Sequence, residues 1–242
     1  MKELSINKKL QATLNDFVRN LQKICADNLI GVILYGSGSS GEFAEKLSNL
    51  NLLVVLNDAS LPRLTLISGL INRWRFRLIH PLFFSQDYIK NSTDVFPIEF
   101  LDMKENYTVL AGRDILKDLS IDTKNLRYQC EQELKVKLIT LRQFYLRNNK
   151  DRTALLNFLL KAFTSTLHIL RNIIRLKGKT PPYLKEDIVK DVSREFGIDK
   201  VAWQDLLAAK NRLVKLRARE IDSAFVNFAR DLEKIIGIVD EL

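Results

Sequence analysis

Asn49 and Asn51 stand two residues apart at the start of an apolar run that extends from Leu50 to Leu56. Residues two apart in a β-strand point to the same face, so the two amide side chains are expected to lie side by side. Two carboxylates in this arrangement would bind divalent cations between the protein and a triphosphate. An asparagine offers one carbonyl oxygen and no charge, and it therefore holds such cations poorly.

A glycine- and serine-rich turn, Gly36-Ser-Gly-Ser-Ser-Gly41, precedes these asparagines, and Ser37 lies twelve residues before Asn49. Glycines let a backbone approach a phosphate closely, and a helix that starts there directs free amides at the anion. The turn thus predicts phosphate binding by Gly36, Ser37 and Gly41. Turns of this kind are also common after buried strands for structural reasons alone, so the turn by itself is weak evidence for a site.

Taken together, a strand, Gly-Ser, a helical turn and paired polar residues on the next strand resemble the signature of the polymerase-beta-type nucleotidyltransferase superfamily. The resemblance covers about residues 28–112. In that superfamily Gly-Ser is followed, after a gap of this length, by Asp-x-Asp or Asp-x-Glu. Here the glycines and the spacing match, and both acidic positions are asparagine, Asn49 and Asn51.

The resemblance also implies a third carboxylate on a neighbouring strand. We expect a strand from Pro97 to Asp102, with Glu99 as the preferred candidate and Asp102 as the alternative. Residues three apart in a strand face opposite sides, so only one of the two could serve. The structural alternative is that both acids close an exposed edge or pair with Lys104.

Replacing both aspartates removes two negative charges where two divalent ions should sit, which predicts very low or absent transferase activity. Nucleotide binding is a separate question, because the Gly-Ser turn can hold phosphates without a metal. Two other functions stay open. One is an active transferase that uses Mg²⁺ with Glu99 or Asp102, and the other is a non-enzymatic, antitoxin-like interaction subunit.

The sequence around these motifs alternates helix-like and strand-like segments, which predicts a small mixed sheet with helices for residues 1–115. From about residue 126 to residue 242 the periodicity is helical throughout, which predicts a helical bundle, with the boundary inside residues 113–125. The expected fold class is therefore α+β. The expected helices are 4–27, 61–72, 126–148, 151–177, 184–196, 200–217 and 219–236, and the expected strands are 30–35, 50–56, 75–84 and 97–102.

The net charge of +9 is unevenly distributed along the chain. Residues 1–112 carry 12 Lys/Arg against 11 Asp/Glu, and residues 113–242 carry 26 against 18. A basic helical half attracts anions, such as nucleotides, nucleic acid or an acidic protein partner, and it disfavours a polycationic antibiotic as substrate. The plainer interpretation is a set of solvated helix faces.

With 46% hydrophobic residues the composition is that of a folded protein, and Cys25 and Cys130 are too few for a disulfide framework. No apolar stretch predicts a membrane partner, and the charged N-terminal residues lack a signal core, so a cytoplasmic protein is expected. The wide apolar surface of 151–177 suits the central bundle helix, or in part a homodimer interface. The two histidines, His80 and His168, are expected to be structural.

Overall fold

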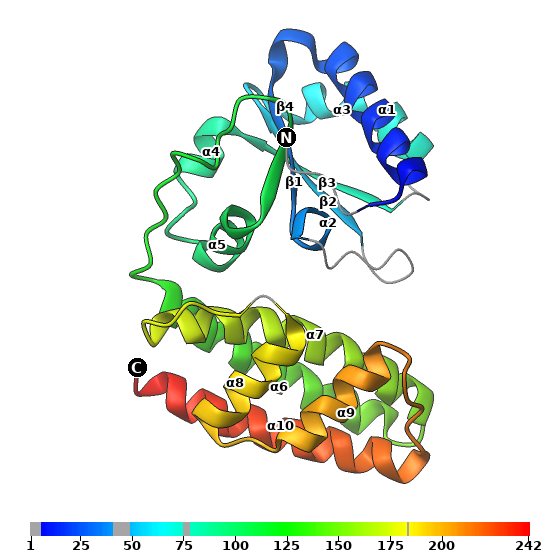
Figure 1. Cartoon of the computed structure of the whole chain (residues 1–242), viewed down its shortest axis with the longest axis vertical. Helices are drawn as coiled ribbons and strands as arrows, with labels where there is room; N and C mark the ends of the chain where they lie inside the picture. Colours follow the sequence, from blue (N-terminus) through cyan, green and yellow to red (C-terminus); the bar gives the residue numbers. More distant parts are fainter. Residues whose placement is uncertain (1–5, 41–48, 75–77, 183) are drawn as a thin grey trace. The chain divides into compact units, whose positions relative to one another are not determined.

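The chain divides into two compact units, Met1–Asp122 and Thr123–Leu242 (Figure 1). The first is built around a four-stranded sheet, and the described part of the second consists of helices and loops, so the predicted α+β class is confirmed. The computed structural model describes residues 6–40, 49–74, 78–182 and 184–242.

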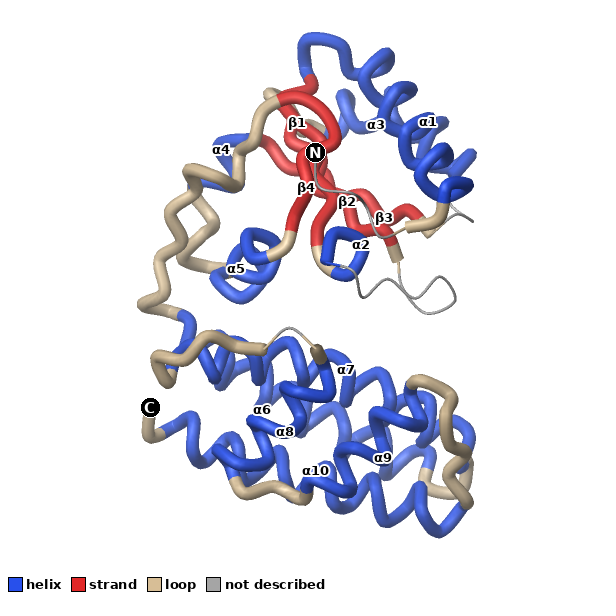
Figure 2. The backbone as a smooth tube through the Cα atoms, viewed as in Figure 1, coloured by secondary structure: helices blue, strands red, loops and turns tan. Residues whose placement is uncertain are grey.

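The sheet of the first unit has the strand order β3-β2-β1-β4 (Figure 2). β1 pairs in antiparallel fashion with both β2 and β4, and β2 and β3 are parallel. Apart from Asn51 in β2, the central strands β1 and β2 carry apolar residues and glycine or tyrosine, because both faces of the sheet are covered. The strands are β1 Leu29–Tyr35, β2 Leu50–Leu56, β3 Ile79–Ser85 and β4 Tyr107–Gly112.

Two long helices, α1 (Lys8–Cys25) and α3 (Leu61–Trp74), cover one face of the sheet (Figure 1). Asn7 caps α1 by accepting a hydrogen bond from the Leu10 amide. Trp74, the last residue of α3, packs edge-on against Phe17 with the ring centroids 5.9 Å apart. These rings belong to a hydrophobic cluster between the two helices and the sheet. Every second residue of β1 and β2 points into this cluster, including Val32, Leu34, Leu52 and Val54.

The opposite face is covered by two short helices, α4 (Gln86–Lys90) and α5 (Pro97–Glu105). Ile33, Leu53 and Val55 alternate along β1 and β2 with the residues that face α1 and α3. Their side chains therefore point to this opposite face, where they pack with residues of α4 and α5. The sheet is therefore the middle of three layers, and the side chain of each strand residue is assigned to one face by alternation.

The predicted strand at Pro97–Asp102 is wrong, because these residues begin helix α5. Pro97 occupies the first turn of that helix, where its missing N–H costs nothing. The strand that does pair with β1 on this side is β4, which the sequence analysis did not assign. The strand expected at 75–84 is shorter than predicted, since β3 begins at Ile79.

The second unit contains five long helices in its described part, and their bounds agree with the predicted segments to within one residue except at two ends. The helix expected at 219–236 continues to Asp240. The segment expected as helix 200–217 ends at Lys210, and Arg212 follows with a positive φ of 59°. The helices are α6 Leu126–Asn148, α7 Arg152–Leu176, α8 Lys185–Phe196, α9 Lys200–Lys210 and α10 Ala218–Asp240.

α7 is the central helix of this bundle, as predicted, and twelve of its residues are buried. Its length and hydropathy would also suit a membrane span, but this burial among α6, α8, α9 and α10 is that of a core helix. Phe163 of α7 packs against Trp203 and Phe228. The Trp203 indole N–H donates a hydrogen bond of 2.8 Å to the buried carboxylate of Asp231.

Candidate functional site

The site predicted from the sequence begins where β1 ends. Gly36 follows Tyr35 with a φ of +72°, a conformation that side-chain-bearing residues rarely adopt. Its N–H donates to the Asn106 carbonyl at 3.1 Å, and its own carbonyl accepts from the Ser39 amide at 2.9 Å. The turn therefore joins the end of β1 to the residue that precedes β4.

A short helix, α2 (Ser37–Ser40), follows and lies directly against the sheet. A Cβ added to Gly38 would lie 3.1 Å from Leu50 and 3.2 Å from Leu34, so only glycine fits here without displacing a neighbour. The Ser39 and Thr108 hydroxyls are 2.8 Å apart, which ties α2 to β4. The Ser37 side chain and Gly41 lie outside the described part of the chain, and their predicted contacts with phosphate stay predictions.

Asn49 and Asn51 occupy the predicted place at the start of β2. Asn49 is exposed, and Asn51 is half-buried on the sheet face that α4 and α5 cover, the face shared by Leu53 and Val55. A Cβ on Gly36 would lie 3.6 Å from the Asn51 amide nitrogen. The structure thus brings Asn51 to the Gly36 turn, as the motif predicts.

Strand register places Asn51 in a row of four residues that crosses the whole sheet. Asn51 pairs with Tyr35 of β1 and with His80 of β3, and Tyr35 pairs with Tyr107 of β4. Paired residues on neighbouring strands share a face, so the row presents two phenols, one amide and one imidazole. Tyr35 and Tyr107 could not be singled out from the sequence, and His80 was expected to be structural, because register between distant strands is not encoded locally.

The phenols of this row have raised pKa values. Burial raises the pKa of Tyr35 to about 12, so the phenol stays neutral at physiological pH. The pKa of Tyr107 is also raised, first by burial and then by its hydrogen bond to Asp114, whose Oδ2 accepts from the hydroxyl at 3.0 Å. An acid is thus linked to the row by a hydrogen bond, Asp114, which lies beyond the end of β4.

The candidate third acids, Glu99 and Asp102, do not lie on a strand. Both belong to α5, where residues three apart share one side of the helix rather than facing opposite ways. Glu99 is exposed and Asp102 is half-buried. The expected geometry of a carboxylate on a neighbouring strand is therefore wrong for both, and a role for either as an acid from α5 stays a prediction.

The four described strands carry no carboxylate at all, since their sequences are LIGVILY, LNLLVVL, IHPLFFS and YTVLAG. Among the residues that the structure describes, three or more His, Cys, Asp or Glu side chains nowhere converge in a group that could hold a metal ion. Near Gly36 lie the Asn51 amide and, on α2 and β4, the paired Ser39 and Thr108 hydroxyls, whereas His80 lies on β3, in register with Asn51.

No protein-family model and no curated protein sequence matches this chain. A solved structure with a similar fold is that of spectinomycin adenyltransferase AAD(9) from Enterococcus faecialis, determined with ATP and spectinomycin. The superposition has a TM-score of 0.59, covers 94% of this chain and 100% of that one, and aligns residues that are 14% identical. At this identity the comparison establishes the fold, and the chain has a nucleotidyltransferase-like fold with a sheet-containing N-terminal unit and a helical C-terminal unit.

Proposed function

We propose that this protein binds a nucleotide at the Gly36 turn and has little or no transferase activity. The observation that carries the proposal is the position of Asn51 beside Gly36, within a nucleotidyltransferase-like fold. A carboxamide can donate hydrogen bonds to phosphate oxygens, whereas a carboxylate at the same place would repel them unless a cation lay between.

Magnesium does not fit the residues at the start of β2. Nucleotidyl transfer depends on metal charge at the reacting phosphate, and Mg²⁺ selects carboxylates and water. Asn49 and Asn51 supply neutral oxygens only. The loss of one well-placed electrostatic interaction lowers the rate on the order of a thousandfold, and here two charges are lost. We therefore assign no catalytic step to a metal at this site.

Hydrogen-bond donors near Gly36 provide an alternative way to hold phosphates. The N–H of Gly36 is already engaged by Asn106, but the amides of Ser37 and Gly38 belong to the first turn of α2, where no acceptor within the helix exists. The Asn51 amide and the exposed His80 imidazole add side-chain donors along the sheet edge. These donors are suited to hydrogen-bond the phosphates of a nucleotide that binds without a metal ion.

A cationic antibiotic is a poor candidate for the second ligand, although the protein with the similar fold is a spectinomycin adenyltransferase. The helical unit here carries 24 Lys/Arg against 15 Asp/Glu, whereas the first unit carries 14 of each. A positive surface repels a cationic acceptor and attracts an anionic partner. We therefore propose that the helical unit contacts an anionic partner.

Calorimetric titration with ATP and GTP, with and without magnesium, tests this proposal. The wild type is expected to bind a nucleotide with an affinity that Mg²⁺ changes by less than about twofold. Asn49→Asp/Asn51→Asp restores two carboxylates without changing side-chain size, and its affinity is expected to rise about tenfold or more with Mg²⁺. Asn15→Asp/Asn72→Asp, which adds two charges at exposed positions of α1 and α3, is the matched control and should show no such gain.

Binding of nucleotide by the wild type only with Mg²⁺ would contradict the proposal and favour an active transferase that uses Glu99 or Asp102. Metal-dependent incorporation of label from α-labelled ATP would then identify the activity. Absence of binding to both nucleotides would favour the interaction subunit instead.

A further inference from the structure

The helices α6 and α10 of the second unit form an apolar groove with a volume of about 490 Å³. Tyr145 and Phe225 meet on its floor with ring centroids 5.2 Å apart. Two aliphatic side chains at the groove are largely in water, since Leu146 is 75% exposed and Val226 is 57% exposed. The apolar residues that line it are Leu141, Tyr145, Leu146, Phe225, Val226 and Ala229.

The rim of this α6/α10 groove is positively charged. Arg142 and Arg230 line it together with one acid, Glu233. The Arg142 guanidinium contacts Glu233 at 2.6 Å, so this acid is already neutralised. Arg230 takes part in no ion pair among the described residues, which leaves its charge available at the edge of an apolar surface.

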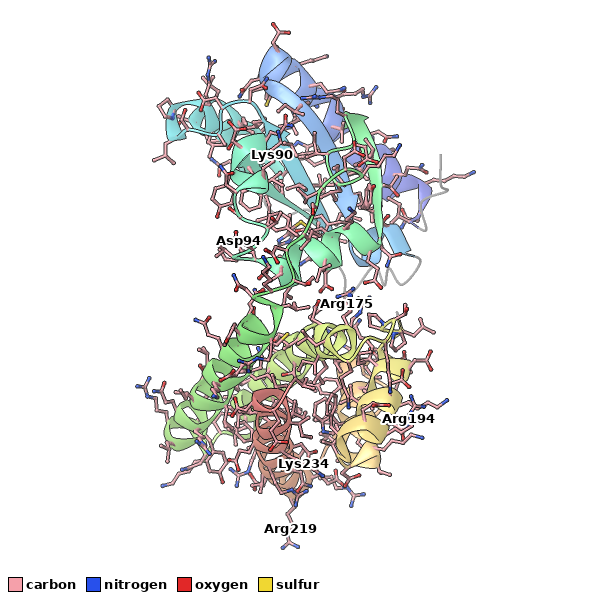
Figure 3. The ribbon with its side chains drawn as sticks, turned by 90° about the vertical axis from the view of Figure 1, so that its left-hand side faces the viewer. Lys90, Asp94, Arg175, Arg194, Arg219 and Lys234 are labelled. Atoms are coloured by element: carbon pink, nitrogen blue, oxygen red, sulfur yellow. The ribbon has the colours of Figure 1, made fainter. Side chains whose placement is uncertain are left out.

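Two further arginines, Arg219 of α10 and Arg147 of α6, lie outside the residues that line the groove. Arg219 lies seven residues before Val226, which is two helical turns and therefore the same side of α10. Figure 3 shows Arg219 extending away from the ribbon. Arg147 follows the exposed Leu146 on α6, and the nearby acid Asp222 is paired with Arg152 at 2.8 Å.

We propose that the α6/α10 groove binds an amphipathic helix of an acidic protein partner. A helix with leucine-like residues on one face would cover Leu146 and Val226, and glutamates or aspartates beside that face would meet Arg219 and Arg230. Arginine is suited to this role because its planar guanidinium binds a carboxylate through two parallel hydrogen bonds. Nucleic acid would satisfy the arginines and leave the aliphatic side chains in water, so the apolar floor favours a protein.

The probe is a labelled peptide of about 20 residues, long enough to form a helix, with leucines along one face and glutamates on the rest. A second peptide has serine in place of every leucine and keeps the same charge. Fluorescence anisotropy measures the affinity of the whole chain for each peptide, for a duplex RNA of about 20 base pairs and for vesicles that contain anionic lipid. The variants are Arg219→Gln/Arg230→Gln and Leu146→Gln/Val226→Gln, all at exposed positions.

Both variants are expected to weaken binding of the leucine peptide about tenfold or more, and the serine peptide should bind the wild type at least about tenfold more weakly than the leucine peptide. Val201→Gln changes an aliphatic residue of α9 that is 65% exposed and lies outside the groove, and it should leave the affinity unchanged. Circular dichroism checks that each variant folds. Equal binding of the two peptides, tighter binding of RNA or vesicles, or no peptide binding would overturn the proposal.

Discussion

At the scale of single residues, the difference between aspartate and asparagine at the start of β2 is one of charge and hydrogen-bonding direction. Asn51 lies beside Gly36 and in register with His80, and its amide offers an uncharged hydrogen-bond donor at this place. An aspartate at this position would repel a phosphate unless a cation lay between the two groups. Under the proposed function, asparagine in place of aspartate would therefore favour a nucleotide that binds without Mg²⁺.

Gly36→Ala is expected to lower the free energy of unfolding by about 1–2 kcal/mol, because alanine is strained at a φ of +72°. Its new methyl would lie 3.6 Å from Asn51, an ordinary contact, so strain in the backbone and not a clash is the cause. Urea unfolding measures the change. Gly69→Ala within α3, where an added Cβ meets nothing within 4 Å, should instead raise stability by about 0.5–1 kcal/mol. Equal effects of the two changes would contradict the assigned backbone conformation.

Tyr35 is expected to ionise about two pH units later than a free tyrosine, because burial raises its pKa to about 12. A raised pKa in the folded state means that the phenol contributes its full stability below about pH 10 and loses it as the pH rises through about 12. Absorbance of phenolate at alkaline pH, compared between the wild type and Tyr35→Phe, isolates this titration. A difference spectrum that titrates near pH 10 would show that the phenol is in water.

At the scale of secondary structure, the elements that the sequence predicted best are those with a complete local pattern. β2 was predicted at its observed bounds, Leu50–Leu56, because a buried central strand is a continuous apolar run. α6 and α7 were predicted to within one residue because their apolar residues recur with helical spacing and a cap or glycine marks the ends.

Elements that depend on distant contacts were not predictable in this way. In α5, Ile98 and Phe100 alternate around Glu99 as they would in a strand, and only Pro97 signals the helix start. β4 is half-buried along its length, and it is fixed by pairing with β1 more than seventy positions earlier in the chain. The same reason explains the candidate site, where Gly36 and Asn51 were identified from spacing but the row through Tyr35 and His80 required the register.

Trp203→Phe is expected to destabilise the helical unit by about 3 kcal/mol. The indole N–H is the donor to Asp231, which is only 4% exposed, and phenylalanine leaves this carboxylate buried without that bond. Chemical denaturation followed by circular dichroism measures the loss. Phe228→Leu, which removes a neighbouring ring without touching the hydrogen bond, is the comparison, and adding Asp231→Leu to Trp203→Phe should recover part of the stability. No recovery in the double variant would assign the loss to packing alone.

At the scale of the whole molecule, the two units differ in core and in charge. The sheet unit buries apolar residues on both faces of its strands, and the helical unit has a separate core around α7. The net charge of the chain belongs to the helical unit, since the sheet unit has equal numbers of cations and anions. This division is consistent with the two proposed tasks, nucleotide binding beside Gly36 and contact with an anionic partner through the basic helical unit.

Because the helical unit has its own core, residues 123–242 expressed alone are expected to fold. Trp203 is the single tryptophan of this unit and is 1% exposed, so its fluorescence should be blue-shifted and should move to longer wavelength on unfolding in urea. In this fragment the combined change Trp203→Phe/Asp231→Leu should alter the thermal midpoint in the same direction as in the full chain, since both partners lie within the unit. A fragment with unfolded-like emission and no cooperative transition would show that the helical core depends on residues 1–122, and the two tasks would then not be separable.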